Sequence, residues 1–224
     1  MDSRHALADI AALFGVPARA AMLTALLDGA ALPSGELARY AGLSAAAASL
    51  NLGKLVQGGL LKVVPAGRSR LYSLAGPQVA HALEALGAMA TRENPRPGLT
   101  AEQRRLRQAR CCYDHLAGVI AVELVSFWRR EQLLRGMAVT TRGRAWFRAH
   151  LDIDFDALEE KRRPLTAGCM DWTERREHLS GALGAAVLET MLHRRWLSRG
   201  ETRRALRITV SGARRLAAWG LAPP

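Results

Sequence analysis

The stretch GELARYAGLSAAAASLNLGKL (residues 35–55) decides the fold of the first part of the chain. Gly42 separates two short amphipathic segments, and Ser44 is well suited to cap the start of the second one. Apolar residues on both segments are spaced so that two helices can bury them against each other: Leu37, Ala41, Leu43, Leu52 and Leu55. The stretch therefore predicts a helix-turn-helix.

The apolar pattern on either side of this motif predicts the surrounding elements. It favours helices at residues 6–15, 17–29 and 78–90 and a hairpin at residues 60–74. Pro17 suits the first turn of a helix, and Pro65 to Gly67 suit a turn between two strands. The order predicts a winged helix-turn-helix domain over residues 1–90, in a chain that is mainly α with short β-hairpins (α+β).

The wing carries the motif that indicates a family. Gly67, Arg68, Tyr72 and Leu74 follow the pattern Gly-Arg-x-x-x-Tyr-x-Leu. With the helix-turn-helix before it, this pattern makes residues 4–90 resemble the ArsR/SmtB family of bacterial winged-helix transcription regulators. The resemblance implies a homodimeric repressor of transcription, whose dimer contact comes from the helices at residues 4–14 and 78–92.

The second helix of the motif is expected to lie in the major groove of double-stranded DNA. The residues left to face the bases are Ser44, Ala46, Ala47, Ser49, Leu50, Asn51 and Lys54. Alanine allows a close approach, and its methyl group can contact a thymine methyl; the helix has no arginine to bind guanine bidentately. We therefore expect weak direct readout biased toward A·T pairs, with Arg68 and Arg70 of the wing on phosphates or in the minor groove.

Composition sets further bounds. The 224 residues carry a net charge of +12, which fits a polyanionic partner, but residues 1–90 contribute +2 and residues 91–224 contribute +10. The sequence predicts no membrane span, and the N-terminal residues, with Asp2 and Asp9, do not resemble a signal peptide. Three cysteines do not form a disulfide framework, so we expect a cytoplasmic protein with reduced thiols.

The second part of the chain contains an internal repeat. A linker is predicted at residues 91–100, followed by a regulatory domain at residues 101–224. HLAGVIAVELV from His115 is similar to HLSGALGAAVL from His178, and VTTRGRAWF (139–147) is similar to ITVSGARRL (208–216). The copies, at about 111–154 and 172–221, are expected to be helix–strand–helix units related by pseudo-symmetry, with extra residues of the second copy near 199–205.

Polar and thiol side chains near the start of each copy form a candidate effector site: Cys111, Cys112, His115, Cys169, Asp171 and His178. On a predicted helix, Cys112 and His115 would share one face at a spacing of i, i+3. Four interpretations remain open. Cys112, His115, Cys169 and His178 could bind a metal, the thiols could be reactive, the domain's tryptophans could line a pocket for a small-molecule effector, or the cysteines could be buried apolar residues. No cofactor is assigned.

The motifs favour a regulator over an enzyme. The chain has no G-x-S-x-G, H-E-x-x-H, P-loop or dinucleotide-binding pattern. We therefore predict a DNA-binding transcription repressor whose second domain senses a small molecule, a thiol-reactive species or a metal. The alternatives are a constitutive architectural DNA-binding protein without an effector, and a winged-helix adaptor that binds protein.

Overall fold

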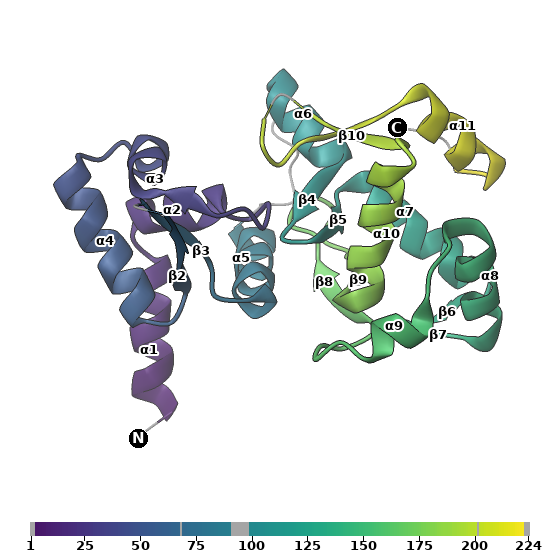
Figure 1. The fold of residues 1–224 in the computed structure, drawn as a ribbon, viewed down its shortest axis with the longest axis horizontal. Coiled ribbons are helices and arrows are strands. Elements are labelled where there is room, and N and C mark those ends of the chain that lie inside the picture. The colour runs from purple at the N-terminus through teal and green to yellow at the C-terminus, as the bar shows by residue number, and fades with distance from the viewer. Residues whose placement is uncertain (1–2, 68, 91–98, 201, 222–224) are drawn as a thin grey trace. The chain divides into compact units, whose positions relative to one another are not determined.

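The computed structural model describes residues 3–67, 69–90, 99–200 and 202–221 (Figure 1). Contacts divide the chain into two compact units, Met1–Leu83 and Glu84–Pro224. The division falls inside helix α5 (Pro77–Ala90), whereas the sequence predicts a boundary at residue 90. Of the predicted linker, residues 91–98 lie outside the described residues.

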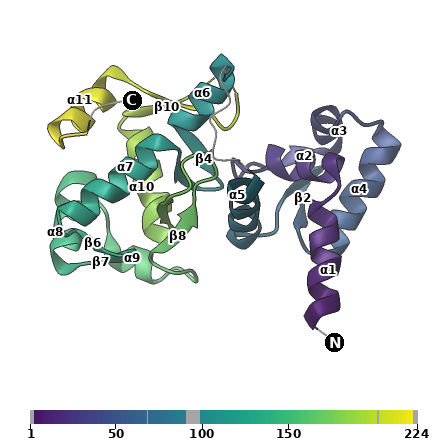
Figure 2. The same ribbon diagram turned by 180° about the vertical axis from the view of Figure 1, so that it is seen from behind.

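The first unit has the predicted winged helix-turn-helix order. Its elements are α1 (Ser3–Phe14), α2 (Pro17–Ala25), β1 (Leu32–Pro33), α3 (Ser34–Ala41), α4 (Ala45–Gln57), β2 (Leu61–Ala66), β3 (Ser69–Leu74) and the first half of α5. The three strands form an antiparallel sheet in the order β1-β3-β2, and β2 and β3 pair from Leu61↔Leu74 to Ala66↔Ser69 as the wing. In both views α4 lies beside this hairpin (Figures 1 and 2).

Local signals set the helix-turn-helix geometry. Gly42 ends α3 in the left-handed region at φ 62°, and the Ser44 hydroxyl accepts a hydrogen bond from the Ala47 amide at 3.3 Å to cap α4. Leu37, Leu52 and Leu55 are buried between the helices as predicted, whereas Ala41 and Leu43 are only half-buried.

No helix within the described residues is by itself long and apolar enough to cross a membrane. The segments Ala6–Phe14 and Pro17–Ala25 meet the criteria only when taken together, and they are bent by 79° to each other.

The second unit contains the repeat, but each copy is a hairpin, a helix, a second hairpin and a second helix. After α6 (Ala101–Gln108), the first copy runs through β4 (Arg110–Cys112), β5 (His115–Ala117), α7 (Val119–Arg130), β6 (Leu134–Arg135), β7 (Ala138–Val139) and α8 (Thr141–Leu151). The short helix α9 (Phe155–Glu159) precedes the second copy, which runs through β8 (Ala167–Met170), β9 (Glu177–Ser180), α10 (Gly181–His193), β10 (Leu197–Arg199), β11 (Leu206–Ile208) and α11 (Val210–Ala218). All four hairpins are antiparallel.

Equivalent residues hold equivalent places in the two copies. Gly118 and Gly181 precede the first helix of each copy at φ 93° and φ 82°, a conformation that favours glycine. Thr140 and Thr209 cap the last helix of each copy by accepting a hydrogen bond from a glycine amide.

The prediction that Cys112 and His115 lie on a helix is wrong. They face each other across the β4–β5 hairpin, whose two-residue turn places Tyr113 at φ 61°. The helix begins only at Val119, because Gly118 directly before it has a backbone conformation that an α-helix does not contain.

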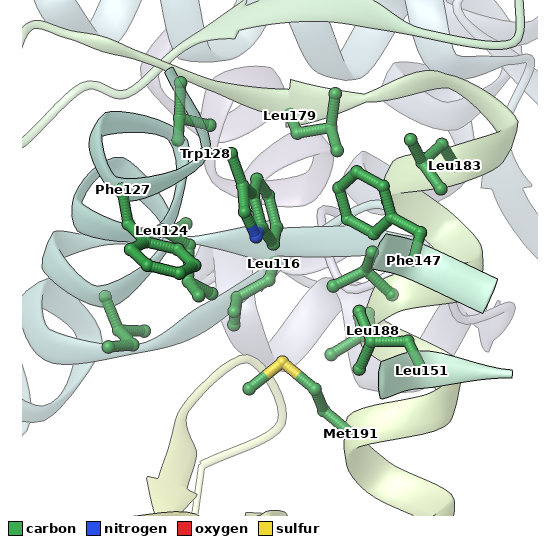
Figure 3. Close-up of a cluster of buried hydrophobic side chains, with 14 of the residues drawn as sticks. Leu116, Leu124, Phe127, Trp128, Phe147, Leu151, Leu179, Leu183, Leu188 and Met191 are labelled. Carbon is green, nitrogen blue, oxygen red and sulfur yellow. The ribbon is translucent and has the colours of Figure 1, made fainter. Parts of the chain in front are cut away.

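The core of the second unit lies between the two copies (Figure 3). Helices α7 and α10 pack against the hairpins β4–β5 and β8–β9, and Leu116 and Leu179 occupy equivalent places in it. Trp128 and Trp196 belong to this core, and Trp146 and Trp219 pack against it. Trp128 packs edge-to-face on Phe147 at 5.1 Å between ring centroids, and Trp146 packs on Trp219 at 5.0 Å.

Candidate functional site

Helix α4 exposes small and polar side chains together with one large apolar side chain, Leu50. Of the residues predicted to face DNA, Ser44, Ala46, Ser49, Leu50 and Lys54 are exposed. Ala48, Leu52 and Leu55 are buried on the other side of the helix, so one face is left for a partner.

The remaining predicted contacts differ in exposure. Ala47 and Asn51 are half-buried, and the Asn51 side-chain amide donates to the Ala47 carbonyl at 2.8 Å. On the wing, Arg70 is exposed on β3 opposite Pro65. Arg68, the other predicted wing contact, lies outside the described residues.

The second candidate site is a buried cluster of two cysteines and two histidines. Cys112 pairs with His115 across β4–β5, and Cys169 pairs with His178 across β8–β9, so each copy contributes one cross-strand pair. The two sulfur atoms lie 3.9 Å apart and the two Nε2 atoms 3.2 Å apart. All four ligand atoms lie within 4.8 Å of one another, and each residue is buried.

A carboxylate lies beside the Nδ1 atom of each histidine. Asp114 Oδ1 is 3.3 Å from His115 Nδ1, and Asp171 Oδ2 is 3.7 Å from His178 Nδ1. Burial by itself would raise the pKa of Asp114, but its hydrogen bond with His115 and the paired Arg163 hold that pKa at about 2. Burial would likewise raise the pKa of Asp171, but the charge of Arg110 and a hydrogen bond from Thr173 hold it at about 2. Both carboxylates are therefore ionised at neutral pH.

A network of buried charges adjoins the cluster, and sequence reasoning missed it. The Arg110 guanidinium, 0% exposed, donates to Glu84 at 2.7 Å and to Asp171 at 3.0 Å. Arg204 donates to the other Glu84 oxygen at 2.8 Å, and the Gly118 amide donates to Asp171 at 2.6 Å. Glu84 lies on an amphipathic helix, where a glutamate is expected at the surface. It is instead 1% exposed, and the two arginines neutralise its charge.

Two of the predicted effector residues do not belong to the four-residue cluster. Cys111 points to the opposite face of β4, where it is buried in the hydrophobic core and receives a hydrogen bond from Arg199 at 3.2 Å. This is because neighbouring residues of a strand point to opposite faces. Asp171 lies behind His178 and is held by Arg110, Thr173 and the Gly118 amide.

The cluster is poorly placed to act as a reactive thiol. The hydrogen bond with Cys169 and burial raise the pKa of the Cys112 thiol well above its usual range, whereas reactive cysteines have lowered pKa values and partial exposure. The two arginines nearest to it in the sequence, which could lower a thiol pKa, are engaged with carboxylates: Arg107 pairs with Glu174 at 2.7 Å, and Arg110 pairs with Glu84 and Asp171. Two thiols and two imidazoles that converge on one point are instead ligands of the kind that a transition-metal ion binds.

Comparison with protein families agrees with the helix-turn-helix of the first unit. Residues 7–64 match a family model described as a helix-turn-helix domain. Among solved structures, the chain is similar to the homodimeric winged helix-turn-helix DNA-binding domain of Mb0332 from Mycobacterium bovis, a possible ArsR-family regulator, at 26% identity and TM-score 0.36 over 38% of this chain and 79% of that one. It is also similar to the cadmium sensor CmtR from Mycobacterium tuberculosis, at 33% identity and TM-score 0.33 over 42% of this chain and 98% of that one.

One relative matches nearly the whole chain, including the second unit. The HTH-type transcriptional regulator YdfF from Bacillus subtilis (strain 168), itself uncharacterized, is 36% identical over 211 residues, which are 92% of this chain and 93% of that protein. The chain therefore belongs to the HTH-type transcriptional regulators, and it is a DNA-binding regulator whose first unit has the winged helix-turn-helix that its motifs predict.

Proposed function

We propose that this protein is a homodimeric repressor that works in the cytoplasm and binds double-stranded DNA through α4 and the wing, under the control of the second unit. The exposed face of α4, with Ser49, Leu50 and Lys54, carries this proposal. Leu50 is 71% exposed and is therefore not needed for packing within the unit. An apolar side chain at this place suits contact with thymine methyl groups.

The helices that dimerise in the ArsR/SmtB family support the dimer. Helix α1 exposes Leu7 (71%) and Ile10, and the end of α5 exposes Leu86 and Met89 (73%). Both pairs are spaced by three residues, so each forms a stripe along one side of its helix. Two copies of the recognition helix in one dimer would read two half-sites, which compensates for the small contact area of one short helix.

DNA binding is tested by fluorescence anisotropy on the region upstream of the protein's own gene, over a series of salt concentrations. Arg70→Ala should weaken binding to all sequences and reduce the slope of log K against log salt by about 0.9, as expected for one lost phosphate contact. Leu50→Ser should weaken the preference for the upstream DNA over scrambled DNA with little change in slope. Arg176→Ala, which removes an exposed arginine of the second unit, is the control. Equal affinity of the unchanged protein for both DNAs would refute a repressor and favour an architectural role.

The dimer is tested by size-exclusion chromatography with light scattering. Leu7→Glu or Met89→Glu should convert the dimer to a monomer, because a charge would then lie in an apolar contact. Val210→Glu is the matched control, since Val210 on α11 is also 71% exposed but lies on neither helix. A monomeric unchanged protein, or dimers in all variants, would exclude these helices as the interface.

A further inference from the structure

We propose that Cys112, His115, Cys169 and His178 bind one zinc-class transition-metal ion in a tetrahedral site. The ion would join the β4–β5 hairpin of the first copy to the β8–β9 hairpin of the second. This site goes beyond the proposed DNA-binding function, and it does not depend on that function, because all four residues lie in the second unit.

The sulfur–sulfur and nitrogen–nitrogen separations match two opposite edges of a tetrahedron around zinc, and all four ligand atoms lie within 4.8 Å of one another. The edge of a tetrahedron is about 1.63 times the distance from its centre to a corner. Zinc–sulfur bonds of about 2.3 Å therefore place two sulfurs about 3.8 Å apart, and zinc–nitrogen bonds of about 2.0–2.1 Å place two nitrogens about 3.3–3.4 Å apart. The Cys112–Cys169 sulfurs are 3.9 Å apart and the His115–His178 nitrogens 3.2 Å apart.

Pairwise contacts alone do not account for the cluster. A disulfide requires sulfurs about 2.05 Å apart, far closer than the 3.9 Å between Cys112 and Cys169. A thiol–thiol hydrogen bond explains the 3.9 Å between the sulfurs, and a hydrogen bond between the histidines explains their 3.2 Å separation. Neither contact requires the two pairs to converge on the same point. A common central ion explains both separations at once.

The surroundings of the histidines are those of metal ligands. A histidine that binds a metal through Nε2 commonly donates its Nδ1 hydrogen to a carboxylate, which fixes the ring and raises its basicity. Asp114 lies within hydrogen-bonding distance of His115 Nδ1, at 3.3 Å, whereas Asp171 lies at the longer distance of 3.7 Å from His178 Nδ1. The backbone amide of Gly118 and the Arg110 guanidinium hold Asp171 in place in turn.

The ligand set and its burial define the type of site. Two sulfurs with two imidazoles favour zinc over magnesium or calcium, which prefer oxygen ligands. Four protein ligands, each 0–2% exposed, leave no position for water or substrate, which is typical of a structural site. We therefore assign the ion a structural role, in which it fixes the two copies of the repeat against each other.

The test is metal analysis of the full-length protein purified anaerobically without added metal, followed by Co²⁺ titration of the metal-free form. We expect one ion per chain, the visible absorption of tetrahedral Co²⁺ and a near-ultraviolet band from thiolate-to-cobalt charge transfer. Zinc should displace the cobalt. Removal of the ion by a chelator should lower the melting temperature, and zinc should restore it.

The chain offers a matched control for the cysteine variants. Cys112→Ser and Cys169→Ser should lose most of the charge-transfer band, whereas Cys111→Ala, next along the same strand but on its opposite face, should retain it. The titration of the unchanged protein remains decisive even if a variant fails to fold. A metal-free protein with no tetrahedral Co²⁺ spectrum, or a Cys112–Cys169 disulfide in the purified protein, would overturn the proposal.

Discussion

Replacement of Arg110 by methionine tests whether the buried charge network stabilises the second unit. Methionine keeps much of the side-chain volume but removes the guanidinium that donates to Glu84 and Asp171. The side chains of Glu84 and Asp171 are both 0% exposed. Their carboxylates would therefore lose the shared cation, and water could not replace it. Removing one partner of a buried ion pair costs about 3–5 kcal/mol.

The arrangement sets where in that range the value should fall. Glu84 retains Arg204, and Asp171 retains the Gly118 amide and the Thr173 hydroxyl, so both keep partial compensation. We therefore expect a loss of about 3 kcal/mol in the free energy of unfolding. Urea denaturation followed by circular dichroism should show this loss in the transition of the second unit.

The control for this prediction is a surface ion pair of similar chemistry. Arg176 lies 3.2 Å from Glu123, and both side chains are about half exposed, so Arg176→Met should cost at most about 1 kcal/mol. The double variant Arg110→Met with Glu84→Gln should lose less than the sum of the single variants, because it leaves one buried charge fewer. A loss below about 1 kcal/mol for Arg110→Met would refute the view that the buried carboxylates depend on this arginine.

Two further predictions concern the backbone and the core of the second unit. Gly118→Ala should destabilise the unit by more than about 2 kcal/mol, because φ is 93° and a Cβ atom would lie 2.5 Å from the Arg107 carbonyl oxygen; Gly136→Ala, at φ 60° with open space around it, should cost about 1 kcal/mol, and the urea midpoints compare the two. Phe147→Ala should cost about 3–5 kcal/mol by the same measurement, since its ring is fully buried against Trp128 and Phe155; a shift within error would contradict its place in the core.

The fold of the first unit could be predicted because its signals are local. Gly42 and Ser44 determine where one helix ends and the next begins, and Leu37, Leu52 and Leu55 lie at a spacing that only a pair of helices can bury. Each of these features needs only residues within a few positions of one another.

The hairpins of the second unit could not be predicted in the same way. Cys111 to His115 have a spacing compatible with one helix face, and a run this short does not distinguish a helix from a strand. The turn depends on Tyr113 at φ 61°, a left-handed conformation that a tyrosine in the sequence does not predict. The burial of Glu84 was hidden for a related reason, since its partners Arg110 and Arg204 are 26 and 120 residues away along the chain.

The positions of Cys112 and Cys169 show why the sequence names the four residues of the cluster as candidates but does not establish that they meet. His115 and His178 are 63 residues apart, but Cys112 and Cys169 are only 57 apart, because the loop of the second hairpin is longer. An alignment that matches the histidines therefore separates the cysteines, and the second copy appears to begin after Cys169. Strand pairing restores the match, since each cysteine lies directly opposite its histidine whatever the length of the turn between them. One hairpin brings two of these side chains together, and it takes the pseudo-symmetric packing of two copies to bring all four within 4.8 Å.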